Sequence, residues 1–238
     1  MKFVNTDAIA NASYETHPYP HTIIENFLKE ECLSEILASI NNLKDETADS
    51  KFIHPESPYE FNKYAFSHNY GELLKEVFVE MNSPEFVSYL EKLTGIQGLL
   101  TDDITLQGAG IHRIKREGRL QLHTDFNSYV KNGIKLDRRI NLLIYMNPDW
   151  KSEYNGDLCI CDKATMTCVK KVAPLLNRCL IFNTSNKSIH GHPVPLSVPD
   201  TINRHSIAVY YYTKNTNGDV DFEGDPVHNT VWYPQIKV

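Results

Sequence analysis

The sequence contains no long hydrophobic run. Its 238 residues include no uninterrupted apolar stretch of about 18 residues, and Met1-Lys2-Phe3-Val4-Asn5 does not begin a secretory signal peptide. Cysteine is also scarce: the five residues are odd in number and form no CxxC pair. We therefore predict reduced thiols in a cytoplasmic protein that does not engage a membrane.

The sequence also lacks a strong charge of one sign. Its 30 acidic and 24 basic residues give a net charge of −6. Because no run of lysine and arginine could follow a phosphate backbone, we expect no nucleic-acid partner. The sequence shows neither an internal repeat nor a low-complexity block, and its length suits one domain, so residues 1–238 are predicted to form a single domain.

The first hundred residues show helical patterns. Apolar residues recur at helical spacing from Glu25 to Leu43 and again from Tyr70 to Met81. Ser83 offers an N-cap directly before a proline, which predicts a third helix that ends at Gly95. Residues 1–100 are therefore predicted to be mainly helical.

Beyond residue 100 the pattern changes to short β-type runs separated by turn-rich stretches. Without helices between them, such strands favour a sandwich, a jelly roll or a barrel over a parallel α/β sheet. The predicted fold class is α+β, mainly β, with helices packed outside the sheet and a ligand site in its mouth. The predicted strands are Gly110–Ile114, Gly118–His123, Ile140–Met146, Asp157–Asp162, Val169–Val172, Arg178–Asn183 and His205–Thr213.

One short motif suggests metal chemistry. The triplet His123-Thr124-Asp125 is followed much later by His190 and then by Arg204. Two imidazoles and one carboxylate are the ligand set that holds non-haem Fe(II) and leaves coordination positions open. An HxD motif alone is a weak signal, because a strand with polar residues on one face also produces it.

The triplet is one of an ordered series of segments between Ile111 and Thr213. These segments are His123–Asn127, Arg138–Trp150, Asn155–Leu158, Arg178–Asn183, Ser188–Pro193 and Arg204–Tyr210. Together with His17–His21 ahead of a helix, the series resembles the 2-oxoglutarate- and Fe(II)-dependent oxygenases of the prolyl 4-hydroxylase-like branch. The resemblance implies a double-stranded β-helix (a cupin-like jelly roll) as the catalytic core at residues 101–215. N-terminal helices would flank this core, and residues 216–238 would form a C-terminal extension.

The resemblance also implies the metal ligands. His123, Asp125 and His190 match the iron-binding and catalytic residues of the family. His192 is the rival for the third position. His190 follows Phe182 by eight positions in the sequence, which matches the number of residues between strand and histidine in the oxygen-sensing prolyl hydroxylases. We therefore expect His190 to be the ligand and His192 to line the pocket.

Two further residues match the binding site for 2-oxoglutarate, and a third is expected beside them. Arg204 corresponds to the residue that anchors the distal carboxylate, and its planar guanidinium can pair with it bidentately. Ser206 shares the strand face of Arg204 and could donate a second hydrogen bond. Tyr145 matches the tyrosine that donates its phenol to the same carboxylate. The alternatives are that Arg204 is a surface charge, that Ser206 is a strand residue without a role, and that Tyr145 is a core aromatic.

Other polar residues leave alternatives open. Tyr210 shares the strand face of Arg204, so it points into the pocket or packs as a core tyrosine. His112 lies near a position where the family often has a pocket tyrosine, and a structural histidine is the alternative. Asn127 and the pair Arg138-Arg139 could contact substrate, although we expect the two arginines to be solvated at the surface.

By the same resemblance, the chain requires Fe(II), 2-oxoglutarate as co-substrate and O2, with ascorbate as a stimulant. Asp125 indicates a hydroxylase, because halogenating relatives lack that carboxylate, and Tyr210 stands where the nucleic-acid demethylating branch has a second arginine. The expected function is hydroxylation of an unactivated C–H bond, foremost in a prolyl residue of a protein or peptide. The alternatives are a small metabolite, amino acid or sugar-linked substrate and, in another class, a non-catalytic jelly-roll binding module.

Overall fold

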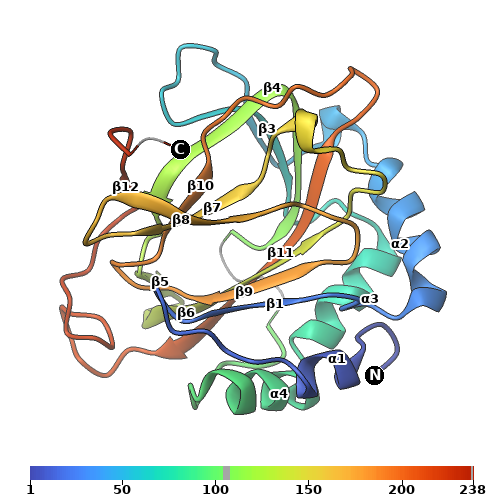
Figure 1. Ribbon diagram of the computed structural model, residues 1–238. Helices are drawn as coiled ribbons and strands as arrows, with labels where there is room; N and C mark the ends of the chain where they lie inside the picture. The colour runs from blue at the N-terminus through green and yellow to red at the C-terminus, as the bar shows by residue number, and fades with distance from the viewer. Residues whose placement is uncertain (104–107, 237) are drawn as a thin grey trace.

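The structure is a computed structural model that describes residues 1–103, 108–236 and 238. Within these ranges, twelve strands join into one curled sheet in which all pairings are antiparallel (Figure 1). The strands are β1 (His21–Ile24), β2 (Ser50–Phe52), β3 (Glu60–Phe66), β4 (Gly110–Thr124), β5 (Ser128–Lys131), β6 (Ile134–Tyr145), β7 (Leu158–Asp162), β8 (Thr167–Val172), β9 (Cys179–Asn183), β10 (Ile189–His192), β11 (Arg204–Lys214) and β12 (Val231–Trp232). The helices are α1 (Thr6–Ala10), α2 (Glu30–Asn41), α3 (Glu72–Met81) and α4 (Pro84–Thr94), with short 3-10 turns at Asp45–Thr47 and Ser152–Tyr154.

The long strand β4 connects the two halves of the curled sheet. Its first half pairs with β11, and its second half pairs with β10 and β12. Between the halves, Glu117 takes a positive φ of 63°, a conformation that a regular strand does not contain. The two strands predicted at Gly110–Ile114 and Gly118–His123 are therefore one strand with a local irregularity.

Side chains along β6 and β11 alternate between two faces. On β6, Ile140, Leu142 and Ile144 belong to the main hydrophobic core together with the buried residues of α2, α3 and α4. On β11, Ile207 and Val209 join the same core. Each such side chain stabilises the fold by about 1.5–3 kcal/mol when fully buried. The residues between them face the other way and are available to form a site.

The three predicted helices are confirmed, with small changes at their ends. The helix predicted from Glu25 begins at Glu30. Ser83 caps α4, because its hydroxyl accepts a hydrogen bond of 3.2 Å from the amide of Phe86, and Gly95 ends that helix at a φ of 74°. No helix within the described ranges is both long enough and apolar enough to span a membrane.

The first hundred residues also contain strands that the helical patterns did not predict. β1 pairs with β9, and β3 pairs with β4. Six of the seven residues of β3 are partly buried and only Phe66 is fully buried, so this strand lacks the apolar alternation that identifies a strand in sequence. The predicted C-terminal extension likewise returns to the sheet as β12, which pairs with β4. Both β3 and β12 therefore join the sheet at β4.

Candidate active site

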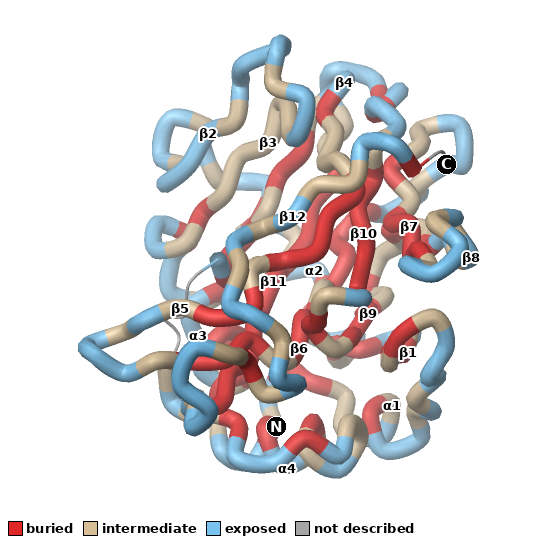
Figure 2. The backbone as a smooth tube through the Cα atoms, turned by 90° about the vertical axis from the view of Figure 1, so that its left-hand side faces the viewer, coloured by how far each residue is buried: buried red, intermediate tan, exposed pale blue. Residues whose placement is uncertain are grey.

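Two thoroughly buried strands carry polar side chains. All four residues of β10 and ten of the eleven residues of β11 are buried, and both strands are largely red in Figure 2. Buried polar groups need partners, either within the protein or in a ligand. Polar side chains from β4, β6, β10 and β11 enclose a cavity of about 190 Å³.

His123, Asp125 and His190 form the one group of three or more potential metal-ligating side chains within residues 1–103, 108–236 and 238. Their ligand atoms all lie within 4.8 Å of one another. Nε2 of His123 lies 3.5 Å from Oδ1 of Asp125, and Nε2 of His190 lies 3.6 Å from Oδ2. The two histidines are cross-strand partners on β4 and β10. This arrangement fits a divalent metal such as Fe(II).

The backbone determines which ring nitrogen of each histidine faces the group. Nδ1 of His123 lies 2.8 Å from the carbonyl oxygen of Gln121, and Nδ1 of His190 lies 2.9 Å from that of Ser188. Because a carbonyl can only accept, each Nδ1 donates, and in a neutral ring Nε2 then directs its lone pair toward Asp125. Burial, and then the nearby His123, lower the pKa of His190 to about 4. Its ring is therefore neutral at physiological pH, as metal binding requires.

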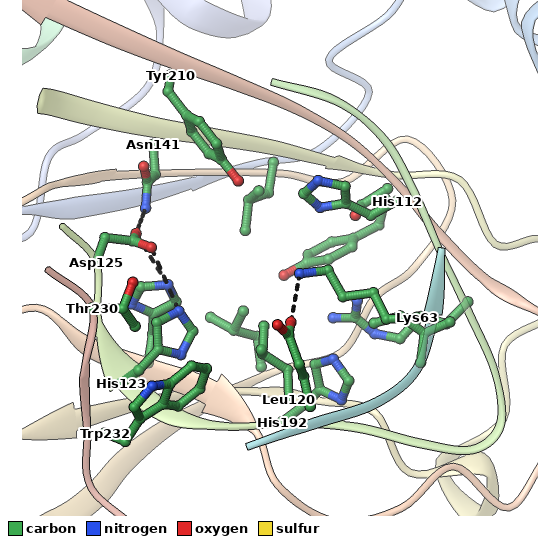
Figure 3. Close-up of a pocket in the computed structure, with 18 residues that line it drawn as sticks. Lys63, His112, Leu120, His123, Asp125, Asn141, His192, Tyr210, Thr230 and Trp232 are labelled. Carbon is green, nitrogen blue, oxygen red and sulfur yellow. Dashed lines mark hydrogen bonds and ion pairs between the residues drawn. The ribbon is translucent and has the colours of Figure 1, made fainter. Parts of the chain in front are cut away.

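A buried network holds the carboxylate of Asp125. Asn141 donates from Nδ2 to Oδ2 of Asp125 at 2.6 Å (Figure 3), and Nη2 of Arg138 lies 3.0 Å from the same oxygen. Arg138 also donates from Nε and Nη2 to Oδ1 of Asn141 at 2.9 and 2.6 Å. Burial alone would raise the pKa of Asp125, but the guanidinium of Arg138 opposes it most strongly, and this pKa lies well below its ordinary value. Asp125 is therefore an anion.

Arg138 was predicted to be solvated at the surface, and this prediction was wrong. The residue is 2% exposed, and its guanidinium lies 3.7 Å from the ring centroid of Tyr210 and 4.8 Å from that of Phe126. The ion pair with Asp125 and these cation–π contacts replace the water that the charge loses. The neighbouring Arg139 remains partly exposed, 3.6 Å from the ring centroid of Phe222.

Strand pairing also brings Arg204, Ser206 and Tyr145 together. Ser206 is the cross-strand partner of Tyr145 on β6 and of His112 on β4. Arg204 lies two residues earlier, on the same face of β11, and its Nε donates to the carbonyl of Gly156 at 2.9 Å. All three residues line the cavity that contains the two histidines and Asp125.

Two donors in this part of the cavity have no hydrogen-bond partner within the described structure. They are the buried Oη of Tyr145 and Nη2 of Arg204, and the Arg204 guanidinium carbon lies 5.0 Å from the Tyr145 ring centroid. Burial raises the pKa of Tyr145, so the phenol keeps its proton. An unpaired buried donor costs about 1–3 kcal/mol. A carboxylate that accepts from both donors would remove this cost, so these residues fit the distal carboxylate of a molecule such as 2-oxoglutarate.

His192 lines the cavity but does not belong to the metal-ligand group. It lies opposite Leu120, because the register of β10 against β4 shifts between His190 and His192. Both of its ring nitrogens are buried without a hydrogen-bond partner among the described residues. Burial, and then Arg204, hold the pKa of His192 well below its ordinary value. A neutral imidazole is therefore available to a ligand.

Of the residues whose roles the sequence left open, His112 and Tyr210 line the cavity. Burial, and then Lys63, lower the pKa of His112 to about 3. Asn127 has a different position: its Nδ2 donates to Oδ2 of Asp221 at 2.8 Å, and its Oδ1 accepts from the amide of His228 at 2.9 Å. Asn127 therefore anchors the C-terminal segment.

Four cavity residues come from outside the stretch Ile111–Thr213 that contains the sequence motifs. Glu60 and Lys63 lie on β3, and Thr230 and Trp232 lie beside or on β12 (Figure 3). They reach the cavity because β3 and β12 both pair with β4. Such pairing between distant segments leaves no spacing pattern in the sequence, so these residues could not be predicted from motifs.

Comparison with known sequences gives one informative match. Residues 109–212 match the family model of the 2OG-Fe(II) oxygenase superfamily, where 2OG is 2-oxoglutarate. No match was found among curated protein sequences. The matched residues include the whole of β4, β6, β10 and most of β11, the strands that enclose the cavity.

Solved structures share the fold at low sequence identity. A prolyl hydroxylase from Trichoplax adhaerens, in complex with a peptide fragment of the oxygen degradation domain of hypoxia inducible factor, has a TM-score of 0.60 at 18% identity, over 87% of this chain and 88% of that one. A Pseudomonas putida prolyl-4-hydroxylase has a TM-score of 0.57 at 12% identity, over 88% and 97%. HygX from Streptomyces hygroscopicus, with nickel and 2-oxoglutarate bound, has a TM-score of 0.53 at 10% identity, over 91% and 94%. The predicted jelly roll is thereby confirmed.

Proposed function

Since the chain belongs to the 2OG-Fe(II) oxygenase superfamily through residues 109–212, we propose that it hydroxylates an unactivated C–H bond in a prolyl residue of a protein or peptide. The chain is an oxygenase whose cofactors are Fe(II) and 2-oxoglutarate. One observation supports the proposal above all. The group formed by His123, Asp125 and His190 shares a cavity with the unpartnered donors of Tyr145 and Arg204.

In this proposal His123, Asp125 and His190 hold the iron. Bound iron, together with 2-oxoglutarate and O2, would supply the oxidising power for hydroxylation, with succinate and CO2 as co-products. Three protein ligands leave the remaining coordination positions open. Asn141 and Arg138 orient the carboxylate of Asp125 through its Oδ2. The protein therefore holds this ligand in position through its own contacts.

Arg204, Tyr145 and Ser206 bind the distal carboxylate of 2-oxoglutarate in this proposal. Arg204 pairs with the carboxylate through its guanidinium, and Tyr145 donates from its phenol. Ser206 lies on the same strand face and adds a hydroxyl donor. Fixing one end of the co-substrate orients its other end, and the buried surroundings exclude water from the reacting groups.

The choice of substrate rests on similarity. Two of the three structural neighbours described above are prolyl hydroxylases, and one of them was determined with a peptide. This similarity supports a prolyl residue as the substrate of the present chain. HygX has also been determined with hygromycin B bound, which favours a small molecule as the second candidate.

Mass spectrometry of reaction products tests the proposal. The protein is supplied with Fe(II), 2-oxoglutarate, ascorbate and O2 and is incubated with proline-containing peptides, each paired with a peptide in which alanine replaces proline. We expect succinate, and addition of one oxygen atom only to proline-containing peptides, with the His123→Ala variant inactive. Oxygen addition to a small molecule instead would select the second candidate, and succinate formation that persists in His123→Ala would contradict the metal assignment.

A further inference from the structure

The side of the cavity next to His123 is lined by Trp232, which comes from outside residues 109–212, and the more exposed Tyr59 packs on its indole. Trp232 on β12 is the cross-strand partner of His123, and their ring centroids lie 5.0 Å apart. Tyr59 stacks on Trp232, with centroids 4.7 Å apart and planes inclined by 17°. Figure 3 shows the indole beside His123 at the cavity, which Trp232 lines. Tyr59 and Trp232 are called the aromatic wall below.

Backbone hydrogen bonds fix the aromatic wall to β4. The carbonyl of Tyr59 accepts from the amide of Gln121 at 2.6 Å. On the other side, Trp232 belongs to β12, and the amide of Tyr233 donates to the carbonyl of Leu122 at 2.8 Å. The wall is therefore attached to the strand that carries His123. A surface that is already ordered binds a ligand at a low entropic cost.

The charged side chains that β3 brings to the cavity neutralise each other. Nζ of Lys63 lies 3.0 Å from Oε2 of Glu60, and these side chains are only 15% and 19% exposed. Leu120, the cross-strand partner of Glu60, adds apolar surface to the cavity. A substrate group that enters here therefore needs no charge of its own.

We infer that the aromatic wall is a substrate subsite that binds the pyrrolidine ring of a prolyl residue against the indole of Trp232. The inference rests on the proposed function and names residues that select its substrate. A prolyl ring is neutral, loses no side-chain rotamer freedom on burial and is commonly bound in aromatic-lined grooves. Because Trp232 lies beside His123, a ring held there would be next to the proposed metal ligands.

Tryptophan fluorescence tests the contact directly, because the chain contains two tryptophans, Trp150 and Trp232. Trp150 is not among the described residues that line the cavity, and its indole donates to the carbonyl of Asn155 at 3.0 Å. A Trp150→Phe variant is loaded with Zn(II), which supports no oxidation, and with 2-oxoglutarate. Acetyl-prolyl-methylamide should then change the emission of Trp232 saturably, and acetyl-alanyl-methylamide should leave it unchanged.

Steady-state kinetics test whether the contact selects substrate. With a peptide that the wild type hydroxylates, Trp232→Ala should raise KM about tenfold. The affinity for 2-oxoglutarate should stay at the wild-type value, because Trp232 lies beside His123 and does not belong to the proposed carboxylate site formed by Arg204, Ser206 and Tyr145. Trp232→Phe keeps an aromatic ring and should restore most of the wild-type KM for the peptide. If Trp232 only supported folding, its loss would not raise the KM for the peptide while leaving the affinity for 2-oxoglutarate unchanged.

The outcomes separate this inference from the proposed function. An unchanged KM in Trp232→Ala, in an enzyme that hydroxylates prolyl peptides, would overturn the subsite and leave prolyl hydroxylation intact. A saturable emission change without prolyl hydroxylation by the wild type would support the subsite and overturn the proposed function. Neither an emission change nor hydroxylation would overturn both. The fluorescence variant keeps Trp232, so the inference remains testable if Trp232→Ala does not fold.

Discussion

Replacing Arg138 with methionine removes the guanidinium but keeps most of the apolar stem. The carboxylate of Asp125 would keep its hydrogen bond from Asn141 but lose its ion pair at 3.0 Å, and Oδ1 of Asn141 would lose both of its guanidinium donors. Removing one partner of a buried ion pair costs about 3–5 kcal/mol, because the other charge stays buried. We therefore expect the free energy of unfolding of the metal-free protein to fall by about 3–5 kcal/mol.

Urea unfolding of the metal-free proteins, followed by circular dichroism, measures this change. Arg139→Met is the matched control, because Arg139 is the next residue on β6 and is partly exposed. It should change stability by about 1 kcal/mol or less. Isothermal titration with Ni(II) adds a second readout: Arg138→Met should weaken metal binding about tenfold to a hundredfold, as expected when a group that orients a metal ligand is lost.

The two readouts can refute the reasoning separately. A loss of stability in Arg138→Met no larger than in Arg139→Met would mean that the buried ion pair contributes little. An unchanged Ni(II) affinity with reduced stability would mean that Arg138 supports the fold without orienting Asp125.

Three further predictions concern other parts of the site. Arg204→Met should weaken 2-oxoglutarate binding about tenfold to a hundredfold and leave the affinity for Ni(II) unchanged. If calorimetry gave the variant the same affinity for 2-oxoglutarate as the wild type, the proposed role of Arg204 would be contradicted. His205 accepts a hydrogen bond of 2.9 Å from Nε of Arg113, and burial, and then Arg113, lower its pKa to about 3 from an ordinary value of 6.5. The unfolded state therefore binds more protons between these pH values, and this residue alone reduces the free energy of unfolding by about 1.4 kcal/mol for each unit that pH falls below 6.5. His205→Gln should therefore reduce the difference between the free energies of unfolding at about pH 7 and about pH 5, both measured by urea unfolding. An unchanged difference would contradict this role of His205. At Gly191, a Cβ would lie 2.7 Å from the carbonyl oxygen of Gln121, so Gly191→Ala should cost about 1–3 kcal/mol and weaken Ni(II) binding, whereas wild-type behaviour would show that β10 can shift without loss.

The parts of the site that the sequence predicted lie on strands with strong local patterns. His123, His190 and Arg204 belong to segments whose order along the chain matches a family, and the structure brings them into one cavity. The alternation along β6 and β11 also predicts which of their residues point away from the core. Local periodicity and motif order therefore carry much of the information on the position of the cavity.

The parts that the sequence did not predict depend on contacts between distant segments. Arg138 on β6 is buried because its partners come from other parts of the chain: Asp125 directly follows β4, and Tyr210 lies on β11. A charged residue just ahead of the strand predicted at Ile140–Met146 gives no local sign of such partners, so exposure was the natural expectation. Lys63 and Trp232 reach the cavity only because β3 and β12 pair with β4, and pairing of this kind is not encoded in the period of either segment.

The most direct test of the cofactor site is an anaerobic titration with Fe(II) and then 2-oxoglutarate, followed through the visible metal-to-ligand charge-transfer band. We predict a saturable band in the wild type that is lost in His190→Ala and kept in His192→Ala, because His190 and not His192 belongs to the metal-ligand group. No band in folded, iron-containing wild-type protein, or a band that survives in His190→Ala and disappears in His192→Ala, would contradict the proposed site.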